Sequence, residues 1–485
     1  MPSSWNRSYR EFVQACRAFR PTDLIPRISA LSAALGEPPY TDQEKLRCPP
    51  WGLAVAARES LLHGNEYRGN LVSARSIDDL MRRFFNCEAT PHPGDPGFLL
   101  SVITPLLYEQ FPWQESIFEE LARSHALLVE GLDHVQTSVI STSSLAELLG
   151  GMDLRAAIGA TFVLQVGAYQ NGGTYNRAWL SQSNFEEVLA LFPKETLEVT
   201  ARRLTATRDD FKKDYEQNSH GNKKLARYDY NPLVRTPFIN FGRDLSFAPA
   251  PRLIMRTVTP GGLYYPGISK YGNAFADEMG RLFEHYIGRN LDLIDGAEVR
   301  PEIVYGPRGV KKSVDWFVVM PGLVLLVECK LKRLGLAARA GDSPLATDLT
   351  SSIERAYRQL EHSIQQMAAK TPEFSHIPTD RPIIALIVSA EPIYTGAAYL
   401  VEQQLTSISS GNLSDVPVAA VSAREVEMLV AYGDEAEQLL LQRAHDRAPG
   451  DLISLRDLPS SPGRENLILE KSWDSYRFPS PASLD

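Results

Sequence analysis

Three polar side chains, Asp315, Glu328 and Lys330, interrupt two apolar runs within residues 311–332. The runs are rich in Val, Leu and Phe and break at Pro321-Gly322, which predicts two antiparallel strands joined by a tight turn. A two-residue turn places Asp315 directly opposite Glu328, with Cβ atoms about 5 Å apart on one face. Lys330 shares that face because side chains alternate along a strand. The pattern therefore predicts two carboxylates and an ammonium group at the mouth of an apolar hairpin.

Two carboxylates that face each other in this way need a positive charge between them, because like charges directly opposite destabilise a sheet. Hard cations such as Mg²⁺ bind one or two carboxylates together with water and phosphate oxygens. Acidic ligands without histidine suit Mg²⁺ or Mn²⁺ better than Zn²⁺. One alternative is a salt-bridged carboxylate pair at a strand end. A second is a register slipped by one residue, because Pro-Gly suits a type II turn better than the primed turns of hairpins.

The surrounding pattern predicts the elements that position these residues. A helix over residues 272–291 has one apolar stripe, with Gly280, Glu284 and Gly288 four residues apart at its edge. Small residues on both sides of Glu284 would let this helix approach another element closely. Strands are predicted over 298–305, around Asp315, around Glu328, over 382–389 and over 417–421. Helices are predicted over 351–367, 397–407 and 423–432, with a Gly-, Ala- and Ser-rich loop over 335–350.

Asp315, followed by Glu328-Cys329-Lys330 after a short apolar strand, resembles the signature of the PD-(D/E)XK nuclease superfamily. The resemblance covers about residues 272–432, roughly a third of the chain, and includes the predicted order αβββαβ followed by a helix, a strand and a helix. One departure is that Ser313-Val314, with no proline, precedes Asp315. The resemblance implies an α/β nuclease core of the restriction-endonuclease-like fold.

The resemblance also suggests further site residues. The segment Gly280–Tyr286 is similar to the first core helix of such nucleases, whose glutamate completes the metal site. Glu284 is therefore the candidate, Glu278 is the alternative, and a plain surface glutamate is a third interpretation. Tyr357 and Gln359 in the next predicted helix occupy positions where some relatives place accessory active-site residues, although core packing is the stronger interpretation for Tyr357.

The activity that the resemblance implies is metal-dependent hydrolysis of DNA phosphodiesters. Asp315, Glu328 and the backbone carbonyl of Cys329 would bind one or two Mg²⁺ or Mn²⁺ ions, Glu284 would support them, and Lys330 would orient the attacking water. The Cys329 thiol should face the opposite side of its strand. A large extra helical domain suggests a bacterial defence or restriction system, with partner proteins or a homodimer. The alternatives are an RNA-cleaving enzyme and a non-catalytic nucleic-acid-binding or scaffolding subunit.

Charge is distributed unevenly along the chain. The formal net charge of −9 argues against a protein covered with nonspecific DNA contacts. Residues 201–256, however, contain twelve Lys or Arg and six Asp or Glu, a net of +6, so the rest of the chain carries −15. Basic residues interleaved with aromatic ones can bind phosphates and stack on bases. The candidates are Lys212, Lys213, Lys223, Lys224 and Arg227. The alternative is a solvated helix that ends in a loop at residues 218–222.

The sequence predicts four regions. Residues 1–200 are expected to form a large all-α domain, with capping boxes at Ser116, Ser144 and Ser183 and a weaker one at Ser76. A basic segment and connector follows over 201–265, with a short strand at 237–241. Residues 266–432 are expected to form the nuclease domain, and 433–485 a helix and a polar tail. With no apolar run of eighteen residues, a polar start and four unclustered cysteines, we expect a cytoplasmic protein without membrane contact.

Overall fold

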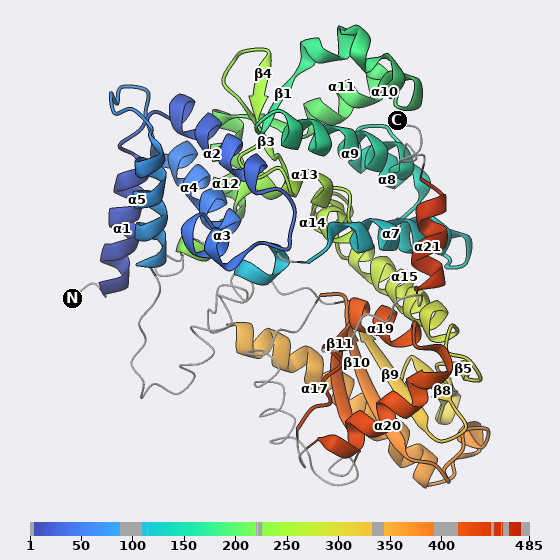
Figure 1. Ribbon diagram of the computed structural model, residues 1–485. Helices are drawn as coiled ribbons and strands as arrows, with labels where there is room; N and C mark the ends of the chain where they lie inside the picture. The colour runs from blue at the N-terminus through green and yellow to red at the C-terminus, as the bar shows by residue number, and fades with distance from the viewer. Residues whose placement is uncertain are drawn as a thin grey trace. The chain divides into compact units, whose positions relative to one another are not determined.

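The computed structural model describes residues 4–87, 109–113, 115–219, 221, 226–331, 344–391, 416–447, 451–456, 458 and 465–476. The chain is mixed α/β and divides into two compact units, which are described separately (Figure 1). Unit 1 comprises Met1–His125, Ser138–Phe275 and Asp474–Asp485, and unit 2 comprises Ala126–Thr137 and Ala276–Trp473. Across the described ranges, no helix is both long and apolar enough to cross a membrane.

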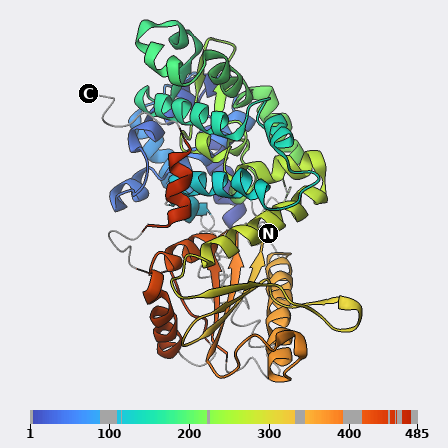
Figure 2. The same cartoon turned by 90° about the vertical axis from the view of Figure 1, so that its right-hand side faces the viewer.

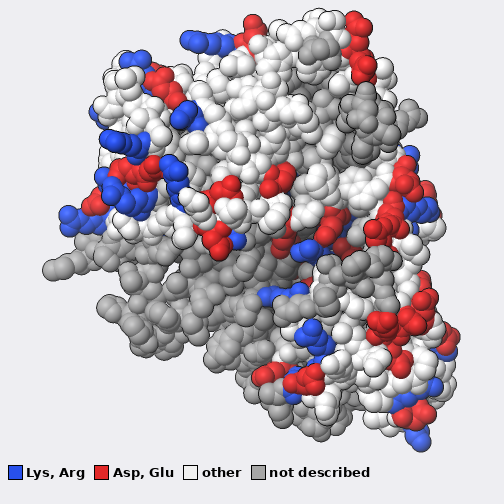
Figure 3. Space-filling model, in the orientation of Figure 1, with Lys and Arg blue, Asp and Glu red and all other residues white. Residues whose placement is uncertain are grey.

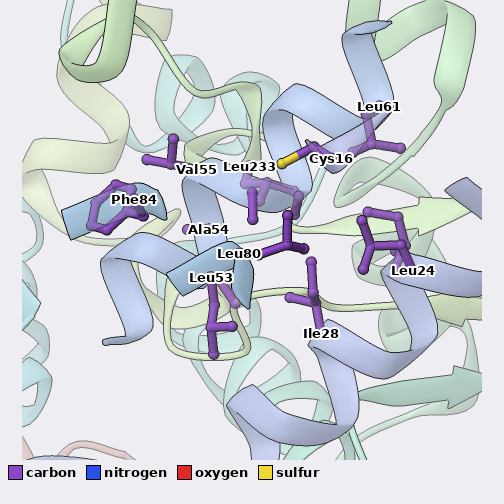
Figure 4. Close-up of a cluster of buried hydrophobic side chains, with 14 of the residues drawn as sticks. Cys16, Leu24, Ile28, Leu53, Ala54, Val55, Leu61, Leu80, Phe84 and Leu233 are labelled. Carbon is purple, nitrogen blue, oxygen red and sulfur yellow. The ribbon is translucent and has the colours of Figure 1, made fainter. Parts of the chain in front are cut away.

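Unit 1 is built mainly from helices. They are α1 (Ser4–Cys16), α2 (Pro21–Leu35), α3 (Asp42–Arg47), α4 (Pro50–His63), α5 (Ala74–Phe85), α7 (Ile117–Leu128, which continues into unit 2), α8 (Thr142–Leu148), α9 (Leu154–Gln170), α10 (Glu186–Leu191), α11 (Lys194–Arg203), α12 (Arg208–Asn218), α13 (Leu253–Arg256) and α14 (Pro260–Tyr271). Helix α4 is buried along almost its whole length because α1, α2, α5 and α12 pack around it. A helix surrounded in this way must be apolar on nearly every face. Figure 4 shows the resulting core, with Leu53, Ala54, Val55 and Leu61 of α4 among its members.

A small sheet in unit 1 corrects the prediction of an all-α domain over residues 1–200. It has the order β1-β4-β3-β2 and contains β1 (Thr174–Asn176), β2 (Thr205–Thr207), β3 (Phe238–Asn240) and β4 (Leu245–Phe247). The short strand predicted at residues 237–241 is confirmed as β3. The others are three residues long, too short to show a period-two pattern, and β1 and β2 pair with strands far away in the sequence.

The turn before β1 explains why two glycines precede this strand. Gly172 and Gly173 have φ values of 60° and 72°, in the left-handed region that favours glycine. A Cβ atom at Gly173 would lie 2.5 Å from the carbonyl oxygen of Ser29 in α2. Gly173 therefore lets β1 approach α2 closely, which is a packing role.

Two of the four predicted capping boxes begin three residues too late. Helix α5 is capped by Ser73, with Ser76 at the third helical position, and α8 is capped by Ser141, with Ser144 at the third position. Helix α10 begins at Glu186, after a 3₁₀ turn over Ser183–Phe185. Serine occupies both ends of the first two boxes, so residue type alone does not reveal which one has extended backbone angles. Helix α7 begins at Ile117, directly after the predicted Ser116.

Unit 2 contains a five-stranded sheet of order β11-β10-β9-β8-β5. Its strands are β5 (Glu298–Pro301), β8 (Trp316–Val319), β9 (Val324–Lys330), β10 (Ile383–Ser389) and β11 (Val418–Ser422). Strands β9, β10 and β11 run parallel, whereas β8 runs antiparallel to β9 and to β5. The single strand predicted over 298–305 is wrong, because β5 ends at Pro301. Strand β6 (Val304–Tyr305) pairs instead with β7 (Lys311–Lys312) in a separate hairpin.

Helices cover both faces of this sheet. They are α15 (Asn273–Leu291, which begins in unit 1), α17 (Pro344–Ala368), α19 (Ala423–Val430) and α20 (Ala436–Asp446). A further helix, α21 (Leu467–Asp474), follows them in the chain. Figure 2 shows α17 in orange and α20 in red on opposite sides of the strands. Burial on both faces explains why β10 is a continuous apolar run. Helix α17 begins at Pro344, so the loop predicted over 335–350 is wrong for its last seven residues, because proline is favoured at a helix start. The helix predicted over 397–407 lies outside the described residues.

Candidate active site

The hairpin register places Asp315 and Glu328 opposite each other, as predicted. Trp316 pairs with Val327, Val319 pairs with Val324, and the amide of Met320 donates to the carbonyl of Leu323 at 3.0 Å. The two carboxylates are the next pair along this register, at the open end of the hairpin. The predicted two-residue turn is confirmed, and the slipped register is excluded.

Asp315 lies at the edge of this buried strand pair and bonds to the neighbouring strand. Its Oδ2 atom accepts a hydrogen bond of 2.6 Å from the amide of Cys329. Burial raises the pKa of the Asp315 carboxyl, although the Cys329 amide and the charge of Lys330 oppose the rise. The Cys329 thiol is half-buried, and burial raises its pKa well above the usual range, so it stays protonated. Asp315 is thus held in place by the backbone, which leaves its other oxygen for a further partner.

Glu328 is the most deeply buried carboxylate of the site, with 1% of its surface exposed. Its Oε1 atom accepts a hydrogen bond from Nζ of Lys330 in an ion pair. Its Oε2 atom has no hydrogen-bond partner within the described residues, although it is buried. Burial first, and the charge of Asp315 second, raise the pKa of Glu328 to about 8. A buried acceptor without a partner is costly, so this oxygen is suited to a cation or a proton.

Helix α15 brings Glu284 to the same place. Burial raises the pKa of Glu284 to about 7, and the charges of Asp315 and Glu302 add to the rise. Trp316 Nε1 donates to the backbone oxygen of Glu284 at 3.1 Å, and a Cβ at Gly288 would lie 2.3 Å from the Trp316 ring. Gly288 therefore allows the close approach that its spacing predicted. Gly280 has no such role, because a Cβ there would meet no described atom within 4 Å.

The alternative glutamate, Glu278, has a different environment. It is buried and forms an ion pair with Arg281, at 3.4 Å. Arg281 also donates to the carbonyl of Gln136 at 2.9 Å. The structure therefore groups Glu284, rather than Glu278, with Asp315.

Two charged residues that lie beside the site, Glu302 and Lys312, were not predicted from the sequence. Lys312 in β7 forms an ion pair of 2.9 Å with Glu302, which lies between β5 and β6. Glu302 raises the pKa of both Asp315 and Glu284, and Lys312 lowers both, so the pair lies beside the two carboxylates. The sequence contains little that predicts this ion pair, because Glu302 and Lys312 come together only through the β6–β7 hairpin, whose strands are two residues long.

Helix α17 holds the backbone that precedes Asp315. The amide Nε2 of Gln359 donates to the carbonyl of Ser313 at 2.6 Å, and Ser363 Oγ accepts from the amide of Val314 at 3.0 Å. Tyr357 is buried in the core. Gln359 and Ser363 are therefore positioning residues for Asp315.

Replacing Ser363 by alanine should lower the free energy of unfolding by about 1–2 kcal/mol, because the buried amide of Val314 loses its acceptor. Urea denaturation monitored by circular dichroism measures this change. The matched control is Ser375→Ala, at an exposed serine beyond α17, which should behave as the wild type. Equal stabilities for Ser363→Ala and the wild type would show that the bond to Val314 contributes nothing.

The raised pKa values of Glu284 and Glu328 predict that the metal-free protein loses stability as the pH rises. Their pKa values in the unfolded chain are near 4.5, whereas the folded protein keeps both protons until about 7 and 8. Between these values the unfolded state binds fewer protons, so the free energy of unfolding falls by up to about 1.4 kcal/mol per pH unit for each titrating group. Urea denaturation in EDTA across this range measures the slope. The double variant Glu284→Gln/Glu328→Gln should lose most of it, and an unchanged slope would contradict the assignment.

The donor set is that of a site for a hard cation. In the described part of the chain, no three His, Cys, Asp or Glu side chains converge closely enough to hold a metal ion as they stand. Asp315 and Glu328 nevertheless offer carboxylate oxygens on one face, and one of these is buried without a partner. Carboxylate oxygens without histidine or thiolate fit Mg²⁺ or Mn²⁺.

The basic segment was expected to supply nucleic-acid contacts, and for Arg227 this prediction is wrong. Arg227 is 1% exposed, and its Nε and Nη2 atoms donate to both carboxylate oxygens of Glu109 at 3.0 and 2.7 Å. Its guanidinium group also lies 4.0 Å from the centre of the Phe84 ring. A buried, bidentate pair leaves no face for a phosphate, so Arg227 has a structural role.

The other candidate contacts of the basic segment differ in their exposure to solvent. Lys213 is exposed and Lys212 is half-buried on α12, whereas Lys223 and Lys224 lie outside the described residues. Phe211 is buried, and the hydroxyl of Tyr215 donates to Asp229 at 2.9 Å, so these aromatic rings pack inside unit 1. On the face in Figure 3, basic and acidic side chains are interspersed over the described surface. The interleaved aromatic pattern is therefore a packing signal.

The chain was compared with protein-family models, curated proteins and solved structures. No family model, no curated protein and no solved structure matches the chain.

Proposed function

We propose that this protein is a metal-dependent nuclease that hydrolyses phosphodiester bonds in DNA, and that unit 2 is a PD-(D/E)XK core of the restriction-endonuclease-like type. The observation that carries the proposal is the pairing of Asp315 with Glu328 at the open end of β8 and β9, with Lys330 on the same face. The element order supports it, since α15, three antiparallel strands, α17 and the parallel strand β10 follow the pattern αβββαβ.

The residues have distinct roles in this proposal. Asp315, Glu328 and the carbonyl of Cys329 would hold one or two Mg²⁺ or Mn²⁺ ions, and Glu284 would bind their waters. Such an ion supplies Lewis acidity and lowers the pKa of bound water near the scissile phosphate. Lys330 would orient the attacking water and stabilise the negative charge that develops on the phosphate. The buried strands around these groups keep bulk water away and strengthen each interaction.

The test is cleavage of supercoiled and linear DNA in the presence of Mg²⁺, Mn²⁺ or EDTA. The wild type should cut with either metal and not in EDTA, and Glu328→Ala/Lys330→Ala should not cut under any condition. Cleavage by the double variant at the wild-type rate would overturn the proposal. RNA oligonucleotides in the same assay would test the alternative substrate.

A non-catalytic nucleic-acid-binding subunit is the second candidate. It is favoured by the ion pair of Lys330 with Glu328 and by the lack of three converging metal ligands among the described side chains. Isothermal titration with Mn²⁺ separates the two functions. Binding that disappears in Asp315→Asn supports the nuclease, and no binding by the wild type supports the subunit.

A further inference from the structure

The hairpin of β6 and β7, here called the ribbon (residues 304–312), is not explained by the proposed chemistry. Val304 pairs with Lys312 and Tyr305 pairs with Lys311 in an antiparallel register. The turn between them contains positive φ angles at Gly306, Arg308 and Gly309. Figure 2 shows this yellow hairpin projecting away from the five-stranded sheet.

The surface of the ribbon is basic and apolar. Arg308 and Lys311 are exposed, and neither forms an ion pair with any described acidic residue. Val310 is 75% exposed and Val304 is 50% exposed. Apolar side chains that project into solvent beside unpaired cations fit an anionic partner with apolar features. Nucleic acid has both, in its phosphates and in the faces and methyl groups of its bases.

The base of the ribbon is anchored inside unit 2. Tyr305 is buried, and its ring meets Phe374 edge-on with centroids 5.2 Å apart. The amide of Ser313 donates to the carbonyl of Ile303 at 3.0 Å, which continues the ladder below the ribbon. The ribbon is thus held at its base rather than hanging as a loose loop.

The ribbon also leads directly into the candidate site. Lys312, at its base, is ion-paired with Glu302 at 2.9 Å, and Asp315 follows three residues later. A nucleic acid bound along the ribbon would therefore reach the paired carboxylates with its backbone.

We propose that the ribbon enters the major groove of duplex DNA, with Arg308 and Lys311 contacting phosphates or base edges, and so presents the adjacent strand to Asp315 and Glu328. The proposal rests on the proposed function and deepens it by naming duplex DNA, bound through its major groove, as the form of the substrate. The major groove of B-form DNA is about 12 Å wide and about 8.5 Å deep, and it admits a two-stranded ribbon. At about 3.3 Å per residue, the two or three residues between the buried Tyr305 and the tip span roughly 7–10 Å, which is comparable with the depth of the groove.

The same geometry selects against duplex RNA. The major groove of A-form RNA is deep and narrow, and side chains do not reach into it. The ribbon should therefore distinguish a DNA duplex from an RNA duplex of the same sequence.

Fluorescence anisotropy in EDTA tests the proposal without cleavage, with labelled duplex DNA, single-stranded DNA and duplex RNA as probes. Arg308→Glu/Lys311→Glu should weaken binding to duplex DNA at least about tenfold and reduce the salt slope by about two. The matched control is Arg443→Glu/Lys471→Glu in α20 and α21, which changes the net charge equally and should bind as the wild type. Because Arg308 and Lys311 are exposed and unpaired, the variants should keep the wild-type circular dichroism spectrum.

The outcomes separate the ribbon from the nuclease. Ribbon-dependent binding with no cleavage by the wild type would support the ribbon and overturn the nuclease. Metal-dependent cleavage by the wild type, together with unchanged DNA binding by the ribbon variant, would support the nuclease and overturn the ribbon's role. Three further results overturn the ribbon's role: no binding of duplex DNA by the wild type, equal weakening by the control, or equal affinity for duplex RNA.

Discussion

Glu328→Gln should abolish metal-dependent cleavage of DNA and, in the same protein, stabilise the metal-free fold. Cleavage is lost because a neutral amide replaces the most buried of the anionic ligands. The fold gains stability because Glu328 is 1% exposed and its pKa is raised to about 8. Removing a carboxylate that burial disfavours should raise the free energy of unfolding at about pH 8 by roughly 1–3 kcal/mol.

Two measurements check this prediction, namely the initial rate of plasmid cleavage with Mn²⁺ and the thermal unfolding midpoint with and without the metal. The wild type should be stabilised by Mn²⁺, and Glu328→Gln should not respond. Glu298→Gln in β5 is the matched control, since this glutamate is exposed and should leave both the rate and the metal response unchanged. A destabilised Glu328→Gln that still responds to Mn²⁺ would show that Glu328 is a structural acid, paired only with Lys330.

Arg227→Met should lower the free energy of unfolding by about 3–5 kcal/mol, because it leaves the carboxylate of Glu109 buried without its partner. It also removes a hydrogen bond to the carbonyl of Phe84 and the contact with the Phe84 ring. Urea denaturation measures the loss. Arg227→Met/Glu109→Met should recover most of it, since removing both charges leaves neither one unpaired.

The control for this prediction is Lys213→Met, a change to a basic residue of the same segment that is exposed on α12. It should alter stability by less than about 0.5 kcal/mol. If Arg227→Met were as stable as Lys213→Met, the buried ion pair would contribute nothing to the free energy of unfolding.

The hairpin that carries Asp315 and Glu328 could be predicted because all of its information is local. Two apolar runs and Pro321-Gly322 set the turn, the turn sets the register, and the register sets which side chains face each other. The helix that contains Glu284 could also be predicted from the sequence, because a long apolar stripe has a clear helical period. Gly288 indicated that this helix approaches another element closely, and the structure identifies that element by the Trp316 ring. In these elements, each residue's partner lies close in sequence or on a face that periodicity identifies.

Other features could not be predicted, because they depend on contacts between residues that lie far apart in the sequence. Arg227 lies in a basic stretch, but Glu109, more than a hundred positions earlier, makes it a buried structural residue. Strands β1 and β2 exist only because β3 and β4 lie beside them. Glu302 and Lys312 join the candidate site only when the short ribbon folds back on itself. Short strands and single ion pairs carry no periodic signal, so long-range packing alone determines which charges are buried, which are paired and which are left facing solvent.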